Sequence, residues 1–214
     1  MYTKMKPELR RVITLLALTI FACILNLRSD NVPGLIWNLV LAWIPYALAL
    51  TILAAGHKKA RWWALLPLGM LWLLFFPNAP YLLTSYIHFS GVDFFPGYGR
   101  AFAHEPWYDL LIFTSYIWGG VLVGFASLDI VHGVVKKHFG GIAGWGTVIA
   151  VCFLSGYAIY LGRFARHNSW DFFRRPWLMF SYVRLSGGAF LFVVVLGIVL
   201  SLIYAGVLSF KKRI

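Results

Sequence analysis

The chain has 214 residues, of which 61% are hydrophobic, 18% aromatic and only 12% charged. Because soluble domains carry about 25% charged residues, this composition excludes a water-soluble globular protein and predicts an all-α, polytopic membrane protein in a lipid bilayer. The formal net charge is +12, but the basic residues lie in short segments beside apolar runs, which argues against nucleic acid as a partner.

Six apolar runs are long enough to cross a bilayer as helices of about 20 residues. They cover residues 12–27, 35–55, 62–83, 107–131, 142–162 and 186–210. None alternates with period two, which argues against a barrel of strands. The first run follows basic residues, as in a signal peptide, but apolar residues continue past Cys23, so we expect it to remain as a span. The short connections favour one integral membrane domain over residues 1–214.

The basic residues predict the orientation of these spans. With the N-terminus inside, every lysine falls in an inner segment, whereas the basic residues of the outer segments are all arginines. The positive-inside rule therefore predicts that both termini are cytoplasmic. Arginine presents a planar fork suited to carboxylates and phosphates, so the outer arginines indicate a function beyond orientation.

The third span is interrupted near its outer end by Pro77 and Pro80. Each proline removes a helical donor and crowds the carbonyl four residues earlier. Because freed backbone groups at membrane depth must be buried in protein or line a wet cavity, Asn78 either satisfies them locally or belongs to a polar pocket. Tyr81 follows this break, and His88 lies where the chain returns to the outer surface.

The fourth span carries acidic residues near both ends. Asp109 lies near the N-terminal end, where the helix dipole favours a negative charge; it either marks the helix end or pairs with an arginine of the connection after the fifth span. Asp129 and His132 lie one turn apart at the inner end. They fit a proton relay, but a helix end in the interface beside Lys136 is the interpretation that we favour.

The segment after the fifth span has the densest set of polar residues. Tyr160, Arg163 and His167 form one stripe if the fifth helix continues outward. Arg166 lies three residues beyond Arg163, on a neighbouring part of the same face. Guanidinium groups that emerge from a span are costly unless they have partners or a function, so this segment is a candidate site.

A short interfacial helix is predicted after that segment. Asn168 or Ser169 could cap its N-terminus, with Asp171 reaching back as in a capping box. Aromatic residues then recur at helical intervals from Trp170 onward, which is typical of a helix lying in the interface. An ordinary aromatic belt explains the same stripe.

The chain resembles a family of bacterial membrane proteins labelled domain of unknown function 1361. The resemblance rests on FPNAPY at 76–81, WYD at 107–109, YLGRF at 160–164 and NSWD at 168–171. It implies a six-span protein of the bacterial cytoplasmic membrane and supplies no activity. In the family pattern an acidic residue follows the threonine after the broken helix, whereas here Ser85 follows Thr84.

Together, the outer residues predict a polar pocket that binds or processes an anionic phospholipid or polyprenyl-phosphate head group. The candidate binding residues are Asn78, Tyr81, His88, Asp109, Tyr160, Arg163, Arg166, His167, Asn168, Trp170 and Asp171. Arginine would hold the phosphate and His167 could move a proton, but no nucleophile, cofactor motif or metal-ligand spacing identifies an enzyme.

Two alternatives to this pocket remain open. One is a small-solute transporter or channel lined by the broken third span. The other is a structural or assembly subunit of a membrane complex, in which Asp109 and Asp171 neutralise Arg163 and Arg166, because buried ion pairs often have structural roles. The sequence leaves the oligomeric state undetermined.

Overall fold

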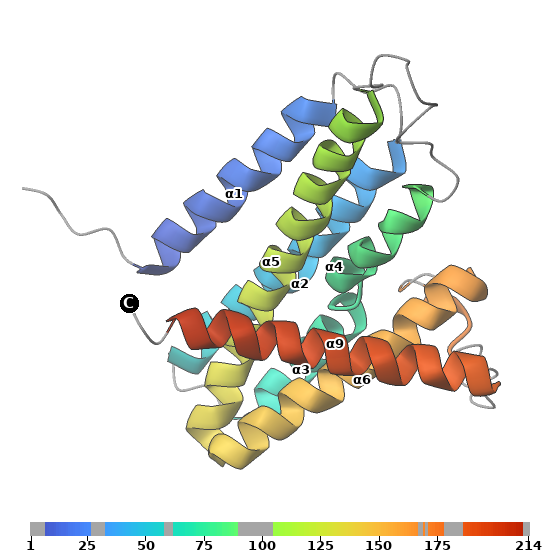
Figure 1. Cartoon of the computed structure of the whole chain (residues 1–214). Coiled ribbons are helices and arrows are strands. Elements are labelled where there is room, and N and C mark those ends of the chain that lie inside the picture. Colours follow the sequence, from blue (N-terminus) through green and yellow to red (C-terminus); the bar gives the residue numbers. More distant parts are fainter. Residues whose placement is uncertain are drawn as a thin grey trace, which may run out of the picture.

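A computed structural model describes residues 7–26, 33–57, 62–89, 105–166, 169, 171–177 and 186–211. Every regular element within these ranges is a helix, which confirms the all-α prediction (Figure 1). The helices are α1 (Pro7–Asn26), α2 (Pro33–His57), α3 (Trp62–Phe75), α4 (Asn78–Tyr81), the 3₁₀-helix η1 (Leu82–Phe89), α5 (Glu105–Phe139), α6 (Gly141–Phe164), α7 (Asp171–Arg174) and α9 (Gly187–Lys211).

Five stretches of the described chain are long and apolar enough to cross a membrane. They are Ile36–Gly56, Trp63–His88, Trp107–Phe139, Gly141–Phe164 and Gly187–Phe210. They coincide with the second to sixth predicted spans, so the chain is a polytopic membrane protein. The first predicted span corresponds to α1, which is not among the five, and a sixth crossing therefore stays a prediction.

Helix α5 is the centre of the bundle and contacts α1, α2, α4, α6 and η1. Of the most apolar part of its span, 56% is buried inside the protein, against 22% for α9, which lies at the periphery. Figure 1 shows α1 and α2 alongside α5, while α6 and α9 lie together and cross the bundle at a steep angle.

Helix α5 also extends beyond the predicted end of its span at residue 131. It continues to Phe139, and Lys136, Lys137 and His138 lie in its last turn. Positive side chains are favourable there because the C-terminal end of a helix carries partial negative charge. We call this end of the bundle the lysine end, and we call the end of α6 that carries Arg163 the arginine end.

Large apolar side chains are both buried between the helices and exposed around them. Tyr46, Tyr116 and Tyr204 are among the largest fully buried side chains, whereas Met70 and Leu202 are about two-thirds exposed. An apolar surface of this extent is unfavourable in water. In a bilayer it contacts lipid tails, which agrees with the membrane class.

The third predicted span is broken where the two prolines predict a break. Helix α3 ends at Phe75, Phe76 and Pro77 form a turn, and the chain continues as α4 and then as η1. In a 3₁₀-helix, residues i and i+3 lie above one another on the same face. The arginine-end part of this span therefore aligns side chains three residues apart on one face.

Two glycines of α5 provide the surface on which the broken helix rests. A Cβ atom at Gly124 would lie 2.5 Å from the Cβ of Ala79 in α4, and one at Gly120 would clash with the side chain of Leu82 in η1. Their spacing places both glycines on one face of α5, as in the small-residue contacts of membrane helices. The absence of side chains at these two positions lets α4 and η1 pack directly on the backbone of α5.

Candidate functional site

Polar side chains from three parts of the chain meet at the arginine end of the bundle. Arg163 lies in the last turn of α6 and is partly buried. Its Nε donates a hydrogen bond to Oγ1 of Thr84 at 2.6 Å, and its Nη2 lies 3.5 Å from Oγ of Ser85. The guanidinium carbon also lies 4.6 Å from the ring centroid of Tyr81. We call Asn78, Tyr81, Thr84, Ser85, Arg163 and Ser169 the Arg163 cluster.

The 3₁₀ geometry of η1 orients the side chains that face Arg163. Thr84 follows Tyr81 by three residues, so both lie on one face. The hydroxyl of Thr84 donates to the carbonyl oxygen of Tyr81 at 2.6 Å. Because that proton is directed to the backbone, a lone pair of the Thr84 oxygen is available to accept from Arg163.

The partners of Arg163 are neutral. Among the described residues, no carboxylate lies within 4 Å of its guanidinium; the ion pair between Arg11 and Asp129 belongs to the lysine end. Hydrogen bonds to a charged group contribute roughly 1.5–3 kcal/mol each, and a desolvated cation–π contact adds about 2 kcal/mol. These contacts offset part of the desolvation cost and leave the positive charge without a counterion in the described chain.

Asn78 connects the broken helix to the segment after α6. Its Nδ2 donates to the carbonyl oxygen of Phe75 at 2.9 Å and to Oγ of Ser169 at 3.1 Å. The carbonyl of Phe75 lies at the break, where regular helical bonding stops. The amide therefore satisfies the break locally and also joins two motifs that are distant in sequence.

Removing the Asn78 amide is expected to destabilise the bundle. Asn78→Ala leaves the carbonyl of Phe75 unsatisfied and breaks the link to Ser169, at a cost of about 2 kcal/mol. Ser169→Ala removes only the second bond and serves as the matched control, with a smaller expected loss. Thermal unfolding in detergent measures both variants, and equal stability of Asn78→Ala and the wild type would contradict this role.

The end of α6 differs from the predicted outward continuation. The helix ends at Phe164, and Arg166 has a positive φ of 55°, a left-handed conformation in which a helix cannot continue. The condition for a single stripe of Tyr160, Arg163 and His167, a helix that continues outward, is therefore not met, because α6 ends at Phe164. The ring of Tyr160 lies 5.0 Å from that of Phe164 and faces α9, and the side chain of Arg166 is exposed.

His88 and Asp109 lie at the contact between η1 and α5. The exposed ring of His88 is 6.0 Å from that of Phe113, and the partly buried Asp109 lies one helical turn from Phe113 on α5. Within the described ranges, neither Arg163 nor Arg166 forms an ion pair with Asp109. The structure thus brings Asn78, Tyr81 and Arg163 together and gives no direct contact between this group and Asp109.

A short helix is present where the sequence predicts the short interfacial helix. Helix α7 contains only the four residues Asp171–Arg174, because Pro176 disfavours the helical conformation at Arg175. Phe173 and Trp177 are exposed beside it. The candidate residues His167, Asn168 and Trp170 lie outside the described residues, so their roles stay predictions.

Thr84 and Ser85 are the site residues that the sequence alone did not identify. Their hydroxyl groups are common in helices and carry no spacing signal, and the 3₁₀ register that turns them toward α6 is a tertiary feature. Ser85 occupies the position at which the family resemblance implies an acidic residue. In this chain a neutral hydroxyl therefore lies beside Arg163.

The fold and this arrangement define a class of protein: an all-helical, polytopic membrane protein with a broken span beside a partly buried arginine. The family model described as Protein of unknown function (DUF1361) matches residues 37–203, and the chain belongs to this family. No curated protein and no solved structure matches the chain. The matched range includes the whole Arg163 cluster and excludes α1.

Proposed function

We propose that the Arg163 cluster binds the phosphate group of an anionic amphiphile, a phospholipid or a polyprenyl phosphate, at the outer face of a bacterial cytoplasmic membrane. One observation carries the proposal: the partly buried guanidinium of Arg163 has hydroxyl and ring partners, and no carboxylate among the described residues lies within 4 Å of it. A bound phosphate would supply the missing counter-charge.

The hydrogen-bond geometry supports a phosphate as the ligand. A guanidinium group has five N–H donors, and the contacts with Thr84 and Ser85 use donors on Nε and Nη2. Donors therefore remain for an anion. Arginine binds phosphate oxygens in pairs, which adds geometric specificity to the charge attraction. The contacts from η1 would hold the guanidinium plane in position for such a ligand.

The surroundings of the cluster favour a ligand that comes from the bilayer. The exposed side chains near the end of α6 alternate between aromatic and basic types: Phe164, Arg166, Phe173, Arg174, Arg175 and Trp177. Aromatic rings and arginines of this kind settle at the level of lipid head groups. An amphiphile could place its phosphate at Arg163 and keep its chains among lipid tails.

The lipids that remain with the purified protein test this proposal. The protein is extracted in mild detergent, and its bound lipids are quantified by mass spectrometry against the lipids of the source membrane. We expect enrichment of a phosphate-bearing anionic lipid in the wild type. A bound fraction with the same composition as the membrane would overturn the proposal.

A negative charge beside Arg163 is expected to weaken this binding. Ser85 is buried, and its Oγ lies 3.5 Å from Nη2 of Arg163, so Ser85→Asp would place a carboxylate where the proposed phosphate charge is needed. We expect a loss of about tenfold or more in affinity for anionic lipid, which corresponds to about 1.4 kcal/mol. Ser85→Asn introduces a side chain of nearly the same size as aspartate but without its charge, so this variant should retain more binding than Ser85→Asp. Equal losses in both variants would contradict the charge argument.

The two alternatives give different results. A transporter lined by the broken helix predicts solute flux in vesicles that depends on Asn78, but both described bonds of the Asn78 amide go to protein groups. A structural ion pair predicts that exchanging Asp109 and Arg163 restores both folding and function in cells, but the described chain has no such pair. The contacts therefore favour the binding proposal over both alternatives.

A further inference from the structure

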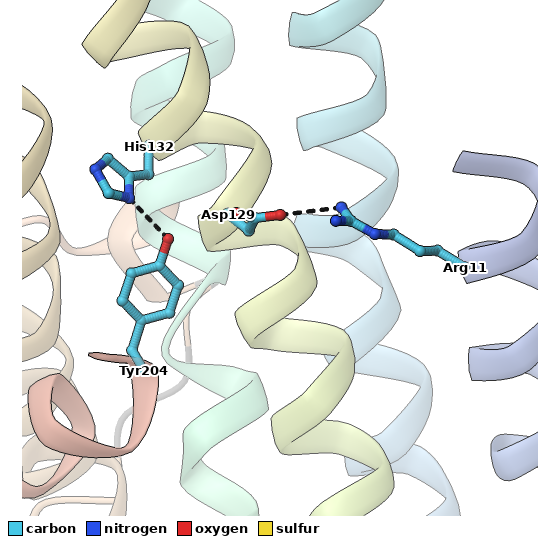
Figure 2. Close-up of polar contacts among 4 residues, drawn as sticks. All are labelled: Arg11, Asp129, His132 and Tyr204. Carbon is cyan, nitrogen blue, oxygen red and sulfur yellow. Dashed lines mark hydrogen bonds and ion pairs between the residues drawn. The ribbon is translucent and has the colours of Figure 1, made fainter. Parts of the chain in front are cut away.

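A second polar network lies at the lysine end of the bundle. It consists of Arg11 in α1, Asp129 and His132 in α5, and Tyr204 in α9, which we call the Asp129 network (Figure 2). Nη1 of Arg11 donates to Oδ2 of Asp129 at 3.0 Å, and Nδ1 of His132 lies 2.9 Å from the hydroxyl oxygen of Tyr204. Ionisable residues inside a membrane bundle indicate a functional site by default.

The four side chains form one electrostatic unit across three helices. Asp129 and His132 lie one turn apart on α5, and Figure 2 shows that Asp129 points toward α1 while His132 points toward α9. Because Asp129 and His132 are separated by only one turn of α5, a charge on His132 acts on the Arg11–Asp129 ion pair over that short distance.

The imidazole of His132 occupies a closely fitted space. Only 7% of the residue is exposed. A Cβ atom at Gly144 in α6 would lie 2.9 Å from Cδ2 and 3.1 Å from Nε2 of the ring, so only glycine leaves room there. The rings of Trp145 and Tyr204 lie 5.1 Å and 5.9 Å from it. This packing holds the imidazole in place and excludes bulk water from most of its surface.

We propose that the Asp129 network is a proton-binding site, in which His132 takes up a proton from the lysine end and the resulting imidazolium competes with Arg11 for the carboxylate of Asp129. The reaction is a single protonation: a proton from water at that end binds an unprotonated ring nitrogen. The charges of Arg11 and Asp129 cancel, so the network changes from neutral to singly positive.

Among the groups around His132, Asp129 is the one that can supply a counter-charge to the imidazolium. The charged neighbours of His132 are Arg11 and the exposed Arg10 on α1, and Asp129 and the exposed Lys136 on α5. The neutral neighbours are Gly144, Trp145 and Cys152 on α6, and Tyr204 on α9. Asp129 is the carboxylate among these described groups. A buried cation is stable only with a nearby counter-charge, so the imidazolium must share Asp129 with Arg11.

Tyr204 allows the proton to bind without loss of the contact between α5 and α9. A phenol is both a donor and an acceptor. Its hydroxyl can donate to an unprotonated Nδ1, and its oxygen can accept from a protonated Nδ1, at the same 2.9 Å separation. Protonation of His132 therefore mainly weakens the ion pair between Arg11 and Asp129, which joins α1 to α5.

The consequence for α1 is a pH-dependent attachment near its N-terminal end. A second polar contact of α1, the bond from Nε1 of Trp43 to Oγ1 of Thr19 at 3.1 Å, lies about two turns further along the helix and contains no titrating group. We expect that contact to persist when His132 is protonated. Proton uptake thus loosens α1 at Arg11 and leaves it held at Thr19.

The imidazole titration of His132 tests the proposal. The full chain carrying ¹³C-labelled histidine is placed in nanodiscs and followed by NMR across pH 5–8. Arg11→Gln removes the competing cation, so the His132 midpoint should move up by about one pH unit, and Asp129→Asn removes the counter-charge, so it should move down by about one unit. His138, an exposed residue on the same helix, is the internal control and should keep its midpoint in both variants.

Each result either supports the proposal or overturns it. A folded Arg11→Gln protein whose His132 midpoint equals that of the wild type would overturn it, as would a His132 that does not titrate in this range. If Asp129→Asn does not fold, Arg11→Gln alone decides, because Arg11 is partly exposed near the start of α1. Arg163→Gln should leave the His132 midpoint unchanged, which separates this site from the proposed lipid site.

Discussion

Arg163→Gln is expected to abolish most of the binding of anionic lipid. The substitution removes the positive charge and the fork of donors while keeping a polar side chain of similar length. Loss of a charge-assisted, paired contact costs about 1.5–3 kcal/mol, which is roughly a 10- to 150-fold rise in the dissociation constant. Binding of the purified protein to a fluorescent phosphatidic acid, in competition with unlabelled lipid, measures this change.

The controls separate the site from general surface charge. Arg174→Gln removes an exposed arginine near the same end of the bundle and should change the affinity by less than threefold, because exposed charges contribute little. Arg163→Lys keeps the charge but loses the planar fork, so we expect only partial recovery of binding. Equal losses in Arg163→Gln and Arg174→Gln would show that binding follows net charge and not the Arg163 cluster.

Gly124→Ala is expected to destabilise the broken helix and, with it, the binding site. The new Cβ would lie 2.5 Å from the Cβ of Ala79, so α4 must move away from α5. Overpacking of this kind costs about 1–3 kcal/mol. We expect a lower thermal unfolding temperature in detergent and weaker lipid binding, because Tyr81 is the last residue of α4 and Thr84 and Ser85 follow it in η1.

Two further variants test this steric explanation. A Cβ atom at Gly119, on the same helix, would meet no atom within 4 Å, so Gly119→Ala should be as stable as the wild type or more stable, since alanine favours a helix by about 1 kcal/mol. The double variant Gly124→Ala with Ala79→Gly restores the space between the helices. If the double variant is no more stable than Gly124→Ala alone, the contact with Ala79 is not the cause of the loss.

Arg163 and Gly124 affect the site in different ways. Arg163 is expected to bind the ligand, so its loss should reduce affinity more than stability. Gly124 positions the partners of Arg163 through its close contact with Ala79 in α4, so its substitution should reduce both affinity and stability. Measuring stability and affinity in parallel therefore distinguishes a ligand contact from a packing contact.

Several features could be predicted from the sequence because they depend on local chemistry. The apolar runs predicted the membrane class, and five of them correspond to helices of membrane length. Pro77 and Pro80 predicted the break, because proline removes a helical donor wherever it occurs. The motifs around Asn78 and Arg163 were grouped as one site, and the hydrogen bond between Asn78 and Ser169 joins the same two segments.

Other features could not be predicted because they depend on how helices pack. Asp109 was expected to pair with an outer arginine, but the side chains that contact Arg163 come from η1, whose 3₁₀ register turns Thr84 and Ser85 toward α6. The stripe from Tyr160 to His167 assumed a continuous helix, and the left-handed conformation of Arg166 ends it. Arg11 pairs with Asp129, a contact between α1 and α5 that the sequence did not indicate.

The sequence by itself determined that this chain is a helical membrane protein and where its third span breaks. These properties follow from composition and from proline chemistry, which act over a few residues. Only the tertiary structure decided which partner each charged side chain has. In a bundle of low dielectric constant, the partner of a charged side chain is whatever group packing brings within a few ångströms. For Arg163 the partners are two neutral hydroxyls, while for Asp129 the partner is the guanidinium of Arg11 in α1.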